Sequence, residues 1–222
     1  MTNKNFKRQS GFSFFYMLLL LIVGYFVWSY IADGDFKDVS AHAEDLRGIL
    51  GDFADQKGIA QKAYKDAMDA KDNAVTIGLK FKDDKTQAFI TKWQNAADEV
   101  SELRKKLKGI DKKANIFFSH IDDELEKINE RSLRNKMTGT VEKKANSFAQ
   151  SLKKTEQAII VLETSIAKGT DIITAIKISG ALGTVSTQIM ELDDLTKSAD
   201  SKFDEIDALV AEGMNILDIE LK

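Results

Sequence analysis

The stretch that decides the fold is TQAFITKWQNAADEVSELRKKLKGIDKKANIFFSHIDDELEKINER, which covers residues 86–131. Its apolar residues recur at steps of three and four, the spacing that brings side chains to one face of an α-helix. The stripe consists of Phe89, Trp93, Ala97, Val100, Leu103, Leu107, Ile110, Ala114, Phe117, Ile121, Leu125 and Ile128. Since one amphipathic helix cannot bury such a stripe alone, the stretch predicts a helix packed against other helices.

The same spacing continues on both sides of this stretch and predicts an all-α chain. The helices expected from it cover residues 36–76, 86–131, 133–177 and 181–219. Asp84 and Ser132 are the candidate N-caps of the second and third helices, and Gly139 and Gly169 are the positions where the third could break. Proline is absent from all 222 residues. Because proline breaks helix interiors, its absence permits helices of this length.

Similar helix lengths and short connections favour an elongated antiparallel four-helix bundle. The alternative is an extended coiled coil in which the last two segments form one rod and pair between chains. Either arrangement buries the apolar stripes, so the sequence leaves both open.

A second stretch, GFSFFYMLLLLIVGYFVWSYIA at Gly11–Ala32, contains no charged residue. As a helix rising about 1.5 Å per residue it is about 33 Å long, enough to cross a hydrocarbon core of about 30 Å. Aromatic residues lie near both of its ends, with Tyr16 toward one end and Trp28 and Tyr30 toward the other, as is typical of interface anchors. The stretch therefore predicts one transmembrane signal-anchor helix with the lipid bilayer as its partner.

The charges beside this stretch predict its orientation. Lys7 and Arg8 precede it and act as further interface anchors, whereas Asp33 and Asp35 follow it. Because lysine and arginine accumulate on the cytoplasmic side, we expect residues 1–10 in the cytoplasm. Residues 33–222 then form a periplasmic domain beyond a bacterial inner membrane.

Two other interpretations of the N-terminus stay open. A cleaved signal peptide usually has an apolar region of about 7–15 residues and small residues before the cut, whereas here the run is longer and the bulky Tyr30 stands two residues before its last residue, Ala32. The segment KRQSGF resembles the leader of type IV pilin-like proteins, which are cut after a glycine, here Gly11. Those proteins usually carry glutamate at the fifth mature position, which is Tyr16 in this chain.

Little in the composition points to chemistry. The formal net charge is −3, which argues against a nucleic-acid partner, and the absence of cysteine excludes disulfides and thiolate sites. His42 and His120 are the only histidines, and the chain has no zinc-protease or phosphate-loop motif. We therefore expect no catalytic residue, cofactor or metal, and a protein that is not an enzyme.

One cluster of basic residues is a candidate binding site for an anionic partner such as a lipid headgroup or a polyanion. It lies in the second predicted helix and consists of Arg104, Lys105, Lys106, Lys108, Lys112 and Lys113. The alternative is a solvated helix surface whose cations pair with neighbouring helices.

Two segments carry a resemblance to a bacterial envelope family described only as a domain of unknown function. The first runs from Ala114 through Phe117-Phe118 to Arg134, and the second from Ala181 to Phe203. The architecture, an anchor followed by a helical bundle, is also similar to that of LemA-type proteins. The resemblance covers about residues 40–220 and implies an envelope location and long helices, but no activity.

These observations favour a membrane-anchored, non-enzymatic scaffold or tether that acts through protein–protein contacts. Its protein partner is unknown, and a second copy of the chain is one candidate. The alternatives are a sensory or regulatory ectodomain and a subunit of a filament or secretion apparatus.

Overall fold

The computed structural model describes residues 36–179 and 185–218, and these residues form four long helices without a strand. They are α2 (Phe36–Val75), α3 (Asp84–Glu126), α4 (Arg131–Ser179) and α5 (Val185–Asp218). The predicted all-α fold is thus confirmed for this part of the chain. The predicted transmembrane segment, Gly11–Ala32, lies outside the described residues.

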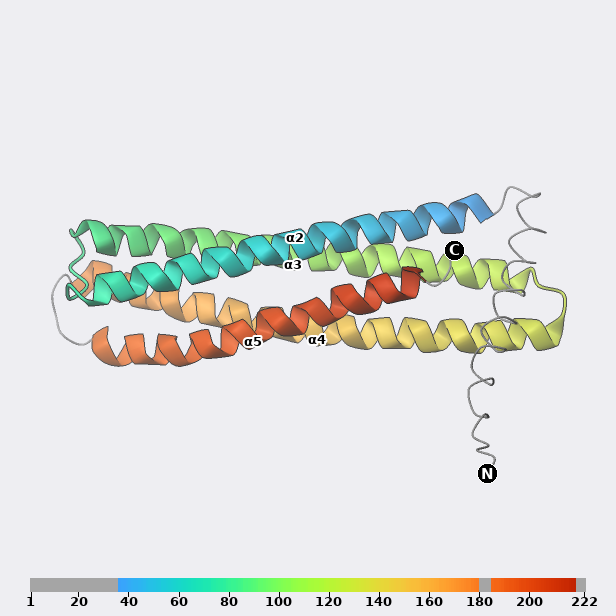
Figure 1. The fold of residues 1–222 in the computed structure, drawn as a ribbon. Coiled ribbons are helices and arrows are strands. Elements are labelled where there is room, and N and C mark those ends of the chain that lie inside the picture. The colour runs from blue at the N-terminus through green and yellow to red at the C-terminus, as the bar shows by residue number, and fades with distance from the viewer. Residues whose placement is uncertain (1–35, 180–184, 219–222) are drawn as a thin grey trace, which may run out of the picture.

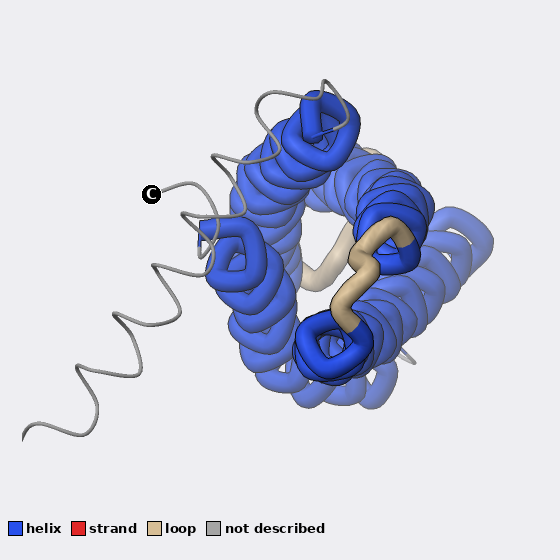
Figure 2. Tube along the Cα trace, turned by 90° about the vertical axis from the view of Figure 1, so that its right-hand side faces the viewer, coloured by secondary structure: helices blue, strands red, loops and turns tan. Residues whose placement is uncertain are grey.

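The helices form an elongated bundle in which sequence neighbours run in opposite directions (Figure 1). Viewed from one end they surround a common axis (Figure 2). The most extensive contact is between α2 and α3; α4 packs on α3 and α5, and α5 closes the ring against α2. The last two segments are therefore separate antiparallel helices, as the bundle predicts, and do not form one rod.

None of the four described helices combines the length and the apolarity that crossing a bilayer requires.

The turn between α2 and α3 corrects one predicted cap. The turn reverses the chain through Gly78 and Leu79, whose φ angles are +82° and +53°. The N-cap of α3 is Asp83, whose Oδ1 accepts a hydrogen bond from the backbone N–H of Lys85 at 2.9 Å. The prediction of Asp84 is wrong by one residue, because Asp84 already has a helical backbone as the first residue of α3.

The connection between α3 and α4 corrects the other predicted cap, Ser132. Helix α3 ends at Glu126, five residues before the predicted Arg131, and α4 begins at Arg131. Ser132 is inside α4, and the carboxylate of Glu130 accepts a hydrogen bond from the backbone N–H of Leu133 at 3.2 Å. A glutamate before the helix takes the role predicted for the serine. Helix α4 continues unbroken through both of its glycines, Gly139 and Gly169.

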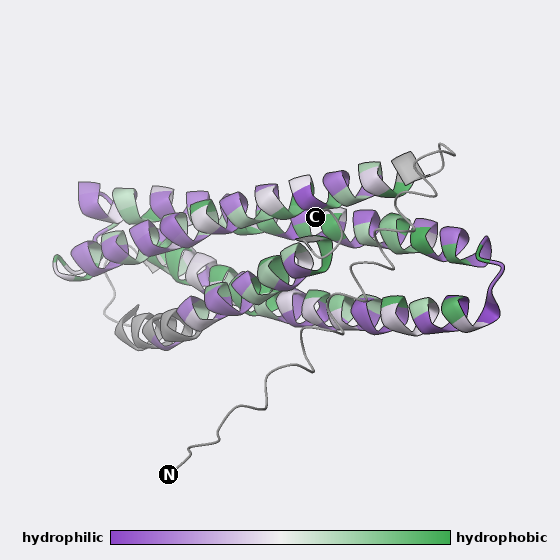
Figure 3. Ribbon diagram, turned by 45° about the vertical axis from the view of Figure 1, so that its right-hand side comes forward, coloured by the Kyte–Doolittle hydropathy of each residue, from purple (hydrophilic) through white to green (hydrophobic). Residues whose placement is uncertain are grey.

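Apolar side chains fill the space between the helices, with Trp93, Tyr64 and Phe53 among the largest that are fully buried. Hydrophobic and hydrophilic residues alternate along each helix, as expected where one side faces a core (Figure 3). Ten of the twelve residues of the stripe predicted for residues 86–131 are buried, nine of them on α3 and Ile128 just beyond its end, whereas Ala97 and Ile121 are half-buried. Ala96 and Ile90 join the core in addition, so the buried stripe is wider than predicted.

Helix α5 covers only part of α4. Near the C-terminal end of α5, Gly213 lies against Leu50 of α2 and Phe148 of α4. Four residues later the carbonyl oxygen of Leu217 accepts a hydrogen bond from Arg47 of α2 at 3.4 Å. Residues 131–147 of α4 extend past this point, toward the end of the bundle where α2 begins (Figure 1). None of these 17 residues is buried.

Candidate functional site

The six predicted basic residues between Arg104 and Lys113 all lie on α3, and we call them the α3 basic cluster. The first of them, Arg104, joins α3 to α4. Its Nε and Nη2 donate to the two carboxylate oxygens of Glu163 at 3.0 and 2.7 Å, and its Nη1 donates to Glu156 at 3.1 Å. This is the fork geometry that arginine forms with a carboxylate. The hydrogen bonding of Arg104 to the Glu163 carboxylate is the main cause that raises the pKa of Arg104 above its ordinary value. Arg104 is therefore committed to a contact within the bundle.

Three lysines of the cluster are also paired with acids. The Nζ of Lys113 lies 2.5 Å from Asp45 of α2, and that of Lys106 lies 4.0 Å from Asp52 of the same helix. The third, Lys105, pairs with Glu102 within α3 at 3.0 Å. The hydrogen bond and the charge of Lys113 lower the pKa of the exposed Asp45 carboxyl below its usual value.

Only Lys108 and Lys112 of the α3 basic cluster are exposed without an ion pair among the residues that the structure describes. The cluster is thus partly the interhelical pairing that the sequence offered as the alternative. Binding of an anionic partner there stays a prediction, and two lysines remain open to it.

Polar side chains in the interior bond across helices. The hydroxyls of Tyr64 on α2 and Ser165 on α4 form a buried hydrogen bond. The indole N–H of Trp93 on α3 donates to the carbonyl oxygen of Ile166 on α4 at 3.1 Å. Gln56 of α2 donates to Glu99 of α3 at 2.7 Å. Because these groups bond to one another, they fix the register of the helices that they join.

The two histidines come together although 78 positions separate them in the sequence. Their rings, on α2 and α3, stack with centroids 4.3 Å apart and planes inclined by 25°. Within the described parts of the chain, no group of three or more histidine, aspartate or glutamate side chains is arranged to hold a metal ion. Nothing in the sequence predicts this contact between the two rings.

The first half of α4 carries a concentration of positive charge that the sequence analysis did not single out. Between Arg131 and Lys154 the chain has seven lysines and arginines and one acid, Glu142. Lys143, Lys144, Lys153 and Lys154 have no ion pair with any residue for which coordinates are described. A count of charges along a sliding window would have found this stretch.

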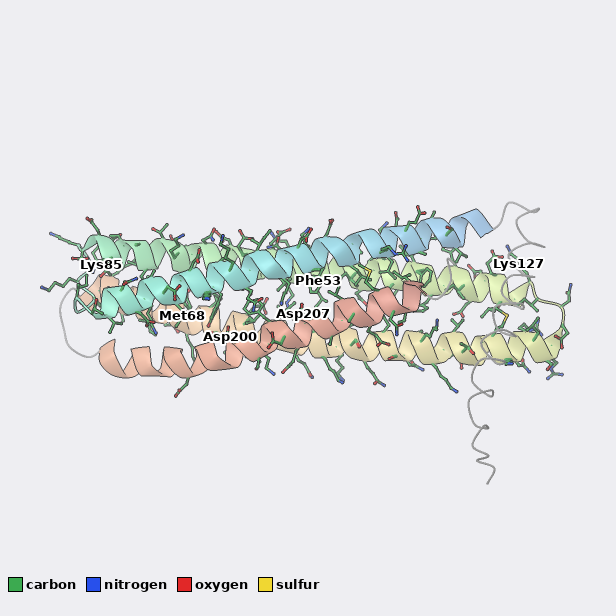
Figure 4. The ribbon with its side chains drawn as sticks, in the orientation of Figure 1. Phe53, Met68, Lys85, Lys127, Asp200 and Asp207 are labelled. Atoms are coloured by element: carbon green, nitrogen blue, oxygen red, sulfur yellow. The ribbon has the colours of Figure 1, made fainter. Side chains whose placement is uncertain are left out.

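The part of this stretch that precedes Ser147 is also the part that α5 leaves uncovered. Its apolar residues Leu133, Met137 and Val141 are only half-buried, in contrast to Phe148, which α5 covers. Farther along, acids of α5 contact both neighbouring helices. Asp207 (labelled in Figure 4) forms an ion pair with Lys57 of α2 at 2.8 Å. Glu212 accepts a hydrogen bond from Ser147 of α4. Within the part of the chain that the structure describes, no such acid pairs with Lys143 or Lys144 of α4.

The predicted membrane-interface residues Lys7, Arg8, Tyr16, Trp28 and Tyr30 lie outside the described residues. They stay predictions.

No family model matches the chain, and neither a curated protein nor a solved structure matches it. The resemblance to a bacterial envelope family and to LemA-type architecture therefore stays a prediction from the sequence.

Proposed function

We propose that this chain is a non-enzymatic scaffold or tether, anchored in the inner membrane by Gly11–Ala32 and projecting into the periplasm, where it acts through contacts with other proteins. One observation carries the proposal. The predicted anchor precedes Phe36, the first residue of α2, and α2 starts at one end of the rod-shaped bundle (Figure 1). The 40 residues of α2, at about 1.5 Å each, place the α2–α3 turn about 60 Å away.

The interior supports a spacer of fixed shape. The core is continuous along the bundle and includes residues from all four helices. Cross-helix hydrogen bonds such as Trp93 to Ile166, and the fork of Arg104 on Glu163, hold α3 and α4 in one register. A rod tied in this way holds bound partners at a defined distance from its anchored end.

The test is membrane insertion and sidedness of the full chain expressed in a bacterium. We expect the protein to stay in membranes after carbonate extraction, and protease added to spheroplasts to digest residues after the anchor. The matched variant carries Leu20→Lys and Val23→Lys, which place two charges at the centre of the apolar stretch. Each costs about 2.5–3.5 kcal/mol of insertion free energy, so the variant should be extracted.

Two results would contradict the proposal. One is release of the wild-type protein by carbonate as complete as that of the double-lysine variant. The other is protection of the whole chain from protease in intact spheroplasts, with digestion only after lysis, because that result would place the bundle in the cytoplasm.

A further inference from the structure

Three lysines in the first half of α4 lie on one side of the helix. Lys136, Lys143 and Lys154 follow at intervals of 7 and 11 residues, and each interval returns to within about 20° of the same direction around the helix. Lys144 lies about 80–100° farther around the helix, in line with Leu133 and Met137, and is half-buried. We call these four lysines, together with Leu133, Met137 and Val141, the α4 face.

The α4 face combines two properties that helices in contact with bilayers share. A row of half-buried apolar side chains continues beyond the end of α5, and basic residues border it. Helices of this kind lie on a membrane with the apolar row at the acyl boundary and the lysines at anionic headgroups. Lysine stems can pack along apolar surface while the ammonium groups stay in water, which suits the half-buried Lys144.

We propose that the α4 face docks on an anionic lipid surface, namely the membrane that holds the predicted anchor. The inference rests on the proposed function, because it requires that anchor. Helix α2 starts at the same end of the bundle as α4 (Figure 1). Only residues 33–35 separate the anchor from Phe36, and three residues reach at most about 10 Å. The uncovered part of α4 is thereby kept close to the lipid surface.

The charges also select the orientation. The end of the bundle carries exposed acids of α3, among them Asp122, Asp123 and Glu126, which an anionic surface repels. The side formed by α4 is basic. Contact therefore occurs along the side of α4, with the bundle tilted toward the membrane, and not through its tip. Attraction of this kind acts within about 8 Å at physiological salt, so only residues on the near side contribute.

The absence of cysteine in the chain permits a direct test with single labels. Thr140→Cys puts a fluorophore in the α4 face, and Ser119→Cys puts one on α3 near the same level of the bundle; both native residues are exposed. The full-length variants are reconstituted in nanodiscs of phosphatidylcholine with or without phosphatidylglycerol. Quenching of each fluorophore by doxyl-labelled lipid is then measured.

We expect strong quenching at position 140 only in discs that contain phosphatidylglycerol, and weak quenching at position 119 in both. Since each lysine near an anionic surface is worth about a fivefold change in membrane partitioning, replacing Lys143, Lys144 and Lys154 with glutamine should abolish the quenching. The matched control replaces Lys105, Lys108 and Lys112 of the α3 basic cluster with glutamine and should retain it. High salt should suppress it.

The outcomes separate the two proposals. A chain that does not copurify with discs contradicts the proposed anchor. A chain that copurifies but shows no quenching at position 140, or equal quenching at positions 140 and 119, overturns docking of the α4 face. Quenching that does not depend on phosphatidylglycerol overturns recognition of anionic lipid. If the label at position 140 is not quenched in discs that contain phosphatidylglycerol, the α4 face does not bind lipid, and an acidic helix of another protein is the remaining candidate partner.

Discussion

The indole ring of Trp93 lies against the backbone of Gly169, so closely that a Cβ atom built on this glycine would stand 1.9 Å from Cζ2 of the ring. The same indole donates its N–H to the carbonyl oxygen of Ile166, one turn earlier in α4. Trp93 is almost fully buried. The absence of a side chain at Gly169 is thus what lets the largest residue of α3 reach the backbone of α4.

This relationship predicts that Gly169→Ala destabilises the bundle. Alanine favours helix by about 1 kcal/mol over glycine, but the added methyl group must displace a buried ring, and overpacking of this kind costs typically about 1–3 kcal/mol and occasionally more. We expect a net fall in the free energy of unfolding, measured by chemical denaturation and circular dichroism. Gly58→Ala is the matched control, because Gly58 is exposed in α2 and a Cβ there meets nothing within 4 Å. An increase in stability for both variants would contradict the prediction.

Arg104→Lys should destabilise the bundle although it keeps the positive charge. Lysine cannot reproduce the two parallel bonds to Glu163 or reach Glu156 at the same time. We expect a loss of about 1 kcal/mol in the free energy of unfolding, consistent with the loss of hydrogen bonds to charged groups. The control is Lys105→Arg, an exposed residue paired only within its own helix, which should change stability by less than about 0.5 kcal/mol. Equal effects of the two substitutions would remove the special role of Arg104.

The Asp45–Lys113 pair should make a pH-dependent contribution to stability. The pKa of Asp45 is lower in the folded chain than its usual value, so the pair stabilises the fold above that usual value, near pH 4. The contribution is lost as the pH falls through the lower, folded-state pKa. Asp45→Asn should therefore be less stable than wild type at neutral pH, and the difference should disappear in strong acid.

The control for this prediction is Asp55→Asn. Asp55 is an exposed acid of the same helix with no ion pair among the described residues. A difference between wild type and Asp45→Asn that persists unchanged into strong acid would show that the pair does not stabilise the fold through charge.

The periodicity of the apolar residues predicted the helices well, because burial in a bundle depends on the same three-and-four spacing that periodicity measures. Phe89, Trp93 and Val100 are buried as predicted. The N-caps were harder to predict from the sequence. Asp83 and Asp84 are adjacent aspartates and equally suited to capping, and only the backbone conformation shows that Asp83 is the cap.

Specific contacts between helices could not be predicted from the sequence, for a different reason. Whether Lys113 meets Asp45, or His42 meets His120, depends on the relative shift of α2 and α3, and apolar stripes alone leave that shift open. The first part of α4 is uncovered because α5 ends before reaching it. Where α5 ends relative to α4 is known only from the packed structure.

The hydrogen bond between Tyr64 and Ser165 should show energetic coupling between α2 and α4. Both side chains are buried, so removing one hydroxyl deprives the other of this partner at a typical cost of about 1–3 kcal/mol. We expect Tyr64→Phe and Ser165→Ala each to lower the free energy of unfolding. The double variant should lose less than the sum of the two, by about 0.5 kcal/mol or more. The matched pair is Tyr64→Phe with Ala63→Gly, which shares no hydrogen bond between its side chains and should be additive. Additivity in both cycles would mean that the two hydroxyls contribute to stability independently of each other.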